Sequence, residues 1–205
     1  MNLEIAASSS QYVILASTSP RRRELLASLH IPFEVIPSEA DETTPEQWEP
    51  ERIVMELALR KAKAVQATLE PATREAVIIG SDTIVVLDGQ VLGKPKDEAE
   101  AASLLRSLQG RSHDVYTAVA CIDVITGRTE VEYRRTTVTM RTAAEEEIAA
   151  YARTGEGLDK AGAYAIQGLG SIFVTGIEGC YFNVVGLPLS LLSEMLGHFG
   201  IHVLR

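Results

Sequence analysis

Hydroxyl and guanidinium side chains gather in a short segment that follows the first apolar run of the chain. The run is Val13–Leu15, and residues 16–23 then read Ala-Ser-Thr-Ser-Pro-Arg-Arg-Arg. Ser19 and Pro20 are typical of a helix start, so three arginines fall in a first turn whose partial positive charge disfavours them. A bound anion resolves this conflict, because backbone N–H groups, serine hydroxyls and guanidinium groups bind phosphate. The segment indicates a phosphate site, with a solvated basic helix start as the alternative.

A carboxylate interrupts an apolar stretch in the middle of the chain. Residues 77–86 are apolar except for Gly-Ser-Asp-Thr at positions 80–83. A carboxylate in a buried strand is costly unless it is paired, hydrogen-bonded or bound to a metal. A functional role for Asp82 therefore explains the pattern better than a structural one. The alternative is an aspartate at a strand end that binds the neighbouring backbone.

Other charged residues could complete a site, although each is weak evidence alone. Lys94 follows a predicted strand and precedes a proline, so it could reach a phosphate or simply lie in a turn. Asp41 and Glu42 lie in an acidic loop, and they could hold a hard cation only if the fold brings one of them against Asp82. Lys61 lies in the C-terminal half of a predicted helix, where cations are expected anyway.

A glycine-rich segment over residues 158–168 is the last candidate for chemistry. Gln167 carries both a donor and an acceptor and could read the edge of a nucleobase. The alternative is a surface loop around a buried Tyr164. The sequence contains no Walker phosphate loop, dinucleotide fingerprint, zinc-ligand spacing or nucleophile elbow. Phosphate binding therefore depends on the arginine-containing turn.

The elements that must position these residues alternate between strands and helices. We predict strands at 13–16, 33–36, 77–87, 91–92, 115–124 and 129–140, a further hairpin at 171–185, and helices at 20–29, 51–69, 97–109, 142–153 and 188–199. Hairpins are more frequent than strand–helix–strand repeats, which favours a mixed central β-sheet flanked by helices, an α/β fold.

Composition limits the classes of protein that the chain can belong to. Its 205 residues predict a single domain over 12–205 behind a flexible N-terminal tail at 1–11. A formal charge of −9 argues against a stable nucleic-acid partner. Cys121 and Cys180 are too few for a disulfide framework and predict free thiols in a reducing compartment. The start of the chain has no signal or transit pattern, and no apolar stretch reaches about 18 residues. We therefore expect a cytoplasmic protein without a membrane partner.

Taken together and in order, the motifs resemble the Maf family of nucleoside triphosphate pyrophosphatases. They are Ser-Thr-Ser-Pro-Arg-Arg at 17–22, Gly-Ser-Asp-Thr-Ile-Val at 80–85, Gly-Lys-Pro at 93–95 and Asp-Lys-Ala-Gly-Ala-Tyr-Ala-Ile-Gln-Gly at 159–168. The resemblance covers nearly the whole chain. The Ile-Gln-Gly ending is similar to the branch that acts on dTTP and UTP, rather than to the 7-methyl-GTP branch.

The resemblance implies a fold, an activity and roles for residues. The fold would be two-lobed with a deep cleft, like that of inosine triphosphate pyrophosphatases, and the protein would be a homodimer. With Mg²⁺ or Mn²⁺, it would hydrolyse dTTP, UTP and, as further candidates, modified pyrimidine nucleotides to the monophosphate and pyrophosphate. Asp82 matches the proton acceptor. Arg21, Thr83 and Gln167 match positions tied to substrate choice, and Arg22, Lys61 and Lys94 match phosphate-side cations. With Ser17 and Ser19 of the first turn, these six residues form the predicted substrate-binding set. The implied metal ligands are Glu42 and Asp82. Ser81 stands where the family often has alanine.

Two rival functions remain open at this point. Members of the family have been linked to cell division arrest as well as to sanitation of the nucleotide pool, so the chain could instead be a non-enzymatic regulator of septum formation that acts through protein contacts. Such a regulator has no need for the set of Arg21, Asp82 and Lys94. A nucleic-acid binder that uses Arg21–Arg23 is disfavoured by the negative charge of the chain.

Overall fold

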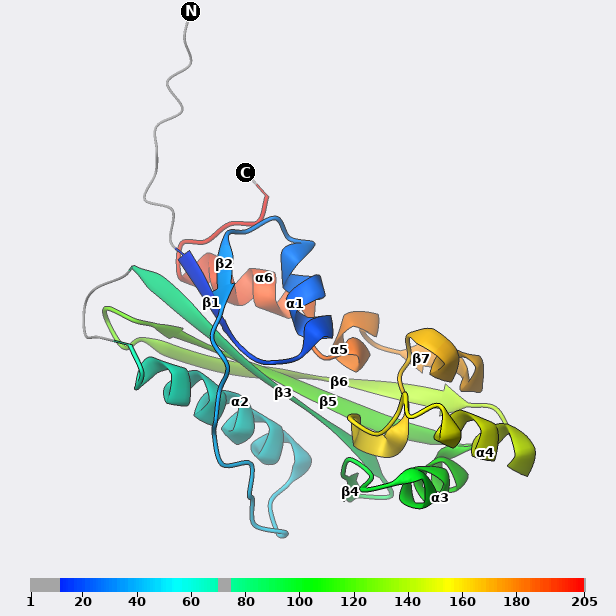
Figure 1. Ribbon diagram of the computed structural model, residues 1–205. Coiled ribbons are helices and arrows are strands. Elements are labelled where there is room, and N and C mark those ends of the chain that lie inside the picture. The colour runs from blue at the N-terminus through cyan, green and yellow to red at the C-terminus, as the bar shows by residue number, and fades with distance from the viewer. Residues whose placement is uncertain (1–11, 70–74, 205) are drawn as a thin grey trace, which may run out of the picture.

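A twisted mixed sheet organises the chain, with helices on both of its faces (Figure 1). The computed structural model describes residues 12–69 and 75–204, so the predicted tail at 1–11 lies outside the described residues. The strands are β1 (Tyr12–Ala16), β2 (Phe33–Val35), β3 (Ala76–Leu87), β4 (Gln90–Leu92), β5 (Ser112–Asp123), β6 (Thr129–Met140) and β7 (Val174–Glu178). The helices are α1 (Pro20–Ala27), α2 (Pro50–Gln66), α3 (Glu98–Leu108), α4 (Glu145–Arg153), α5 (Tyr181–Val185) and α6 (Leu189–His198), with 3₁₀ turns η1 (Ala161–Ala163) and η2 (Gly168–Phe173).

The sheet combines parallel and antiparallel pairing, as the sequence predicts. Its strand order is β2-β1-β3-β5-β6-β7, and β4 pairs with β3. β1 runs parallel to both β2 and β3, whereas β3, β5, β6 and β7 pair antiparallel in succession. The predicted mixed α/β architecture is confirmed.

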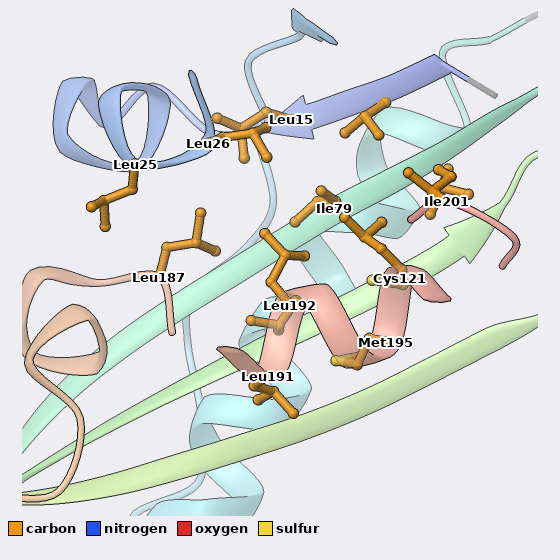
Figure 2. Close-up of a cluster of buried hydrophobic side chains, with 14 of the residues drawn as sticks. Leu15, Leu25, Leu26, Ile79, Cys121, Leu187, Leu191, Leu192, Met195 and Ile201 are labelled. Atoms are coloured by element: carbon orange, nitrogen blue, oxygen red, sulfur yellow. The ribbon is translucent and has the colours of Figure 1, made fainter. Parts of the chain in front are cut away.

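Each face of the sheet is covered by its own helices. α1 and α6 pack on one face, where Leu26, Leu192 and Met195 meet Ile79 and Cys121 from the strands (Figure 2). On the other face lies α2, whose apolar positions recur at helical spacing. Successive side chains of a strand point to opposite faces, so neighbouring residues of β3 contact different helices.

The edge of the sheet beside β3 is interrupted, and this interruption positions the site. β1 ends where Ala16 pairs with Gly80, and β4 begins to pair only at Val85. Between these points, residues 81–84 of β3 have no strand partner on that side among the described strands. The turn after β1 and the segment after β4 therefore flank an open stretch of strand.

Only one strand of the predicted hairpin at 171–185 is present. β7 pairs with β6, but the chain then forms α5 in place of a second strand. The cause is the buried Asn183, whose side-chain amide donates to the Val115 carbonyl at 2.9 Å and to Thr136 Oγ1 at 3.0 Å. These contacts hold residues 181–185 as a helical turn over the sheet.

The start of α4 also differs from its prediction. The helix begins at Glu145 rather than at 142, its N-cap is Ala144, and the Glu147 carboxylate accepts from the Ala144 backbone N–H at 2.9 Å. No helix within residues 12–69 and 75–204 combines the length and the apolar character needed to cross a bilayer.

Candidate active site

A cavity of about 320 Å³ lies at the interrupted edge of the sheet. Its walls come from the turn after β1, the middle of β3, α2, the segment after β4 and the segment around η1. Ten of the eleven candidate residues line it: Ser17, Ser19, Arg21, Arg22, Glu42, Lys61, Asp82, Thr83, Lys94 and Gln167. Asp41 does not, and its carboxylate accepts from the Thr43 backbone N–H at 2.9 Å. Segments far apart in the sequence thus bring their polar residues to one cavity.

The turn after β1 is built by its own serines. Ser17 Oγ accepts from the Ser19 backbone N–H at 3.1 Å, and Ser19 Oγ accepts from the Arg22 backbone N–H at 3.4 Å. Ser19 is therefore the N-cap of α1, with Pro20 as its first residue. A hydroxyl that accepts from the backbone keeps its own proton, so both serines can still donate to an anion.

Asp82 lies in an ion-paired cluster on the α2 side of the sheet. Lys61 Nζ is 2.5 Å from Asp82 Oδ1 and 2.7 Å from Glu42 Oε1. Burial alone would raise the pKa of Glu42, but the hydrogen bond and the charge of Lys61, with two other cavity cations, lower it. The buried Asp82 carboxylate is therefore paired with the Lys61 ammonium, which offsets the cost of burying a charge.

Gly80 brings α2 close enough to form this cluster. A Cβ atom at Gly80 would lie 2.2 Å from the Ala58 carbonyl oxygen and 2.8 Å from the Ala62 backbone nitrogen. No side chain fits in that space. The close packing of α2 on β3 places Lys61 beside Asp82.

Arg22 lies on the opposite side of β3 and is largely engaged by the protein. Its Nε donates to the Gly186 carbonyl at 2.8 Å, and its Nη2 donates to Thr83 Oγ1 at 3.0 Å. Burial lowers the pKa of the Arg22 guanidinium, against the raising effect of the Asp82 charge. Arg22 therefore joins α1 to β3 and α5, a bracing role that the sequence did not predict. Its role as a phosphate-side cation stays a prediction.

Two further residues at the cavity were missed by the sequence analysis. Asp159 Oδ2 lies 3.7 Å from Arg21 Nη1, and Lys160 Nζ lies 2.5 Å from Asp159 Oδ1. Both residues line the cavity. Both residues stand at the start of the motif at 159–168, so the sequence did contain a sign of them. The neighbouring residues, however, do not indicate that Asp159 lies beside Arg21, which is distant in the sequence.

The segment that carries Gln167 is fixed by a partly buried hydrogen-bond network around Glu156. The Glu156 carboxylate accepts from the backbone N–H groups of Leu169 and Gly170 at 3.0 and 2.9 Å, and from Tyr151 Oη at 3.0 Å. Tyr151 Oη in turn accepts from the Ala165 backbone N–H at 3.2 Å. Backbone on both sides of Gln167 is thereby tied to α4 and the turn after it.

The carboxylates of the site suit a hard divalent cation. Within residues 12–69 and 75–204, no three His, Cys, Asp or Glu side chains form a ready metal cluster. Glu42 and Asp82 nevertheless converge on one ammonium group. Two carboxylates combined with substrate phosphates are a typical Mg²⁺ environment. Glu42 and Asp82 therefore fit a divalent cation whose remaining ligands include the phosphates of the substrate.

The fold and the site define an α/β protein with a charge-lined cleft at the edge of a mixed sheet. Its fold is similar to that of the Staphylococcus aureus Ham1 protein, with a TM-score of 0.51 and 15% identity over 92% of this chain and 99% of that chain. At this identity the similarity concerns the fold alone.

The sequence gives the finer assignment. A model of the Maf-like protein family matches residues 12–199, and the chain belongs to the Maf family. It is 50% identical over 192 residues to a dTTP/UTP pyrophosphatase of Pelotomaculum thermopropionicum, covering 94% of this chain and 98% of that protein. It is 51% identical over 191 residues to a dTTP/UTP pyrophosphatase of Moorella thermoacetica, covering 93% and 96% respectively.

Proposed function

We propose that this protein hydrolyses dTTP and UTP to the nucleoside monophosphate and pyrophosphate. The observation that carries the proposal is the single cavity in which a paired acid, several cations and an amide side chain meet. The dTTP/UTP pyrophosphatases named above support it, because their similarity extends over nearly the whole chain. Modified pyrimidine nucleotides are further candidate substrates.

The cations and hydroxyls of the cavity would hold the triphosphate. Lys61, Lys94 and Arg21 approach from three different segments, and the serines of the first turn can donate to phosphate oxygens. Positioning and neutralisation of charge supply most of the catalysis in reactions of this type. We therefore assign the phosphates to the region between the turn after β1 and Lys94.

Asp82 is the proposed proton acceptor. A water oxygen attacks the α-phosphorus and forms the new P–O bond, while the bond from the α-phosphorus to the bridging oxygen breaks and pyrophosphate leaves. The proton released by the water passes to the Asp82 carboxylate, a step worth roughly 10²–10⁴-fold in rate. Lys61 holds Oδ1 of that carboxylate at 2.5 Å and so orients it.

Glu42 and Asp82 would hold a divalent cation, Mg²⁺ or Mn²⁺, together with substrate phosphates. When bound, the cation supplies positive charge that stabilises the phosphate oxygens. Lys61 would have to yield part of its contact with both carboxylates, because its ammonium lies between them.

Gln167 is the proposed reader of the base. Uracil and thymine present an N3–H group between two carbonyl groups, and a side-chain amide can both donate to and accept from such an edge. The network around Glu156 fixes the segment that presents Gln167. A fixed polar site rejects a base with the wrong pattern, because buried groups would then stay unpaired.

We further propose that the protein acts in the cytoplasm as a homodimer. Exposed apolar side chains surround the edge strand β7, and they are Leu169, Ile172, Ile177, Tyr181 and Phe182. Apolar side chains gathered at a sheet edge are typical of an interface. Sanitation of the nucleotide pool and control of cell division are both compatible with this activity.

A nucleotide panel with a pyrophosphate readout tests the proposed activity. The purified protein with Mg²⁺ should release pyrophosphate from dTTP and UTP, and more slowly from CTP and GTP. A strong preference for GTP would overturn the assignment to the dTTP/UTP branch. Absence of pyrophosphate from every nucleotide would favour a non-enzymatic regulator that acts through protein contacts.

A further inference from the structure

Thr117 lies directly behind Thr83 but outside the cavity. The two residues are register partners on β5 and β3, and their hydroxyl oxygens are 3.0 Å apart. Thr117 is fully buried and does not line the cavity, whereas Thr83 does. Thr117 therefore cannot touch a ligand itself, and Thr83 is the cavity-lining residue to which its hydroxyl is hydrogen-bonded.

The direction of each hydrogen bond in this network follows from the number of protons. Thr117 Oγ1 donates its single proton to the Asn183 carbonyl oxygen at 2.7 Å, since a carbonyl can only accept. It has no proton left for Thr83, so Thr83 must be the donor in the bond between them. Arg22 Nη2 also donates to Thr83 Oγ1, at 3.0 Å.

Thr83 consequently has no proton to offer a ligand. Its one proton points to Thr117, one lone pair receives Arg22, and one lone pair remains. We propose that Thr117 is a specificity-positioning residue, which makes the Thr83 hydroxyl an obligate acceptor that selects a substrate N–H or O–H group. This inference rests on the proposed function.

An obligate acceptor excludes some contacts and requires others. Ionised phosphate oxygens carry no proton, so Thr83 does not bind them. The donors of a pyrimidine nucleotide are the N3–H of uracil or thymine and the hydroxyls of the sugar. These sources share one chemistry, a hydrogen-bond donor on the nucleoside, and substrate analogues separate them.

The experiment compares each parent nucleotide with an analogue that lacks one donor. UTP is paired with 3-methyl-UTP, which lacks N3–H, and dTTP is paired with 2′,3′-dideoxy-TTP, which lacks the sugar hydroxyl. The value of kcat/KM is measured for both pairs with the wild type, Thr117→Val, Thr117→Ser and Thr83→Val. Thr117→Ser is the matched control, because it keeps the hydroxyl that receives the Thr83 proton.

We expect the wild type to prefer the parent in one pair by about tenfold, the value of one well-placed hydrogen bond. In Thr117→Val the Thr83 proton is free to point elsewhere, and the ratio should fall to about twofold. Thr117→Ser should keep the wild-type ratio between parent and analogue. A general loss of activity would lower parent and analogue alike, so the ratio separates positioning from structural damage.

Each outcome either supports or overturns the proposed role of Thr117. An unchanged ratio in Thr117→Val for both pairs, or no preference in the wild type, overturns the inference while pyrophosphate release upholds the proposed function. If Thr117→Val does not fold, Thr83→Val provides the test. It should lower kcat/KM for the preferred parent to the level of its analogue, and equal fractional losses for both would overturn the inference.

Discussion

Asp82 shows how far the chemistry of one residue could be inferred from its surroundings in the sequence. An acid inside an apolar strand requires a partner, and Lys61 is that partner at 2.5 Å. The sequence indicated Lys61 as a cation near a helix end, and the family resemblance implied that it binds substrate, but neither paired it with Asp82. Nothing local indicated that Gly80 would let this helix approach the strand so closely.

Replacement of Lys61 tests the ion-paired cluster. In Lys61→Met the carboxylates of Glu42 and Asp82 lose their shared cation, so we expect kcat/KM for UTP to fall roughly 10²-fold, as for removal of one preorganised charge. Pyrophosphate release measures the effect. Lys63→Met is the matched control, because Lys63 is exposed on the same helix. Activity of Lys61→Met within twofold of the control would contradict this role.

The hydrogen bonds of Arg22 to distant parts of the chain could not be predicted from the sequence. Its contact with the Gly186 carbonyl joins residues 164 positions apart. The type and spacing of neighbouring residues carry no information about such a contact. The sequence could indicate that Arg22 belongs to the site, but not which of its nitrogens the protein already occupies.

At the scale of elements, the site exists because β1 stops at Ala16 while β3 continues. The strands and helices that carry clear periodicity, such as α2 and the β5–β6 hairpin, were predicted well. The segment 171–185 was not, because its apolar and aromatic residues suit a strand as readily as a helical turn. The helical conformation of residues 181–185 is stabilised by hydrogen bonds from the buried Asn183 side chain to residues of β5 and β6, which are distant in the sequence.

Gly80 gives the test of how elements position the site. In Gly80→Ala the new methyl group would collide with the backbone of α2, with the Ala58 oxygen at 2.2 Å. We expect a loss of about 1–3 kcal/mol in the free energy of unfolding, together with lower kcat, because Lys61 moves away from Asp82. Denaturant unfolding and pyrophosphate release measure both. Gly176→Ala is the control, since nothing lies within 4 Å of its added methyl group. Equal stability of the two variants would refute the close-packing argument.

For the whole molecule, net charge and local charge differ in sign. The chain carries −9 overall, yet its cavity gathers arginine and lysine from several segments. Composition predicts no stable nucleic-acid partner, which stays a prediction, and it could not describe the cavity. The order of the motifs along the chain was the informative signal, because the fold brings all of them to one place.

His113 predicts how the stability of the whole molecule depends on pH. Burial lowers its pKa from 6.5 to about 4, against the raising effect of Asp114. The unfolded chain therefore takes up the proton first, and the free energy of unfolding should fall as the pH drops from 6.5 towards 4. The loss from this group is at most about 3 kcal/mol. Urea unfolding of wild type and His113→Gln across this range measures it, and identical slopes would rule out the contribution.

The most direct test of the account is pyrophosphate release from dTTP and UTP by the wild type and by Asp82→Asn. With Mg²⁺, the wild type should release pyrophosphate and nucleoside monophosphate in equal amounts. Asp82→Asn should keep the thermal unfolding midpoint of the wild type and lose at least about 10²-fold in kcat. Near-normal turnover by folded Asp82→Asn would contradict the central claim that this acid takes the proton of the attacking water.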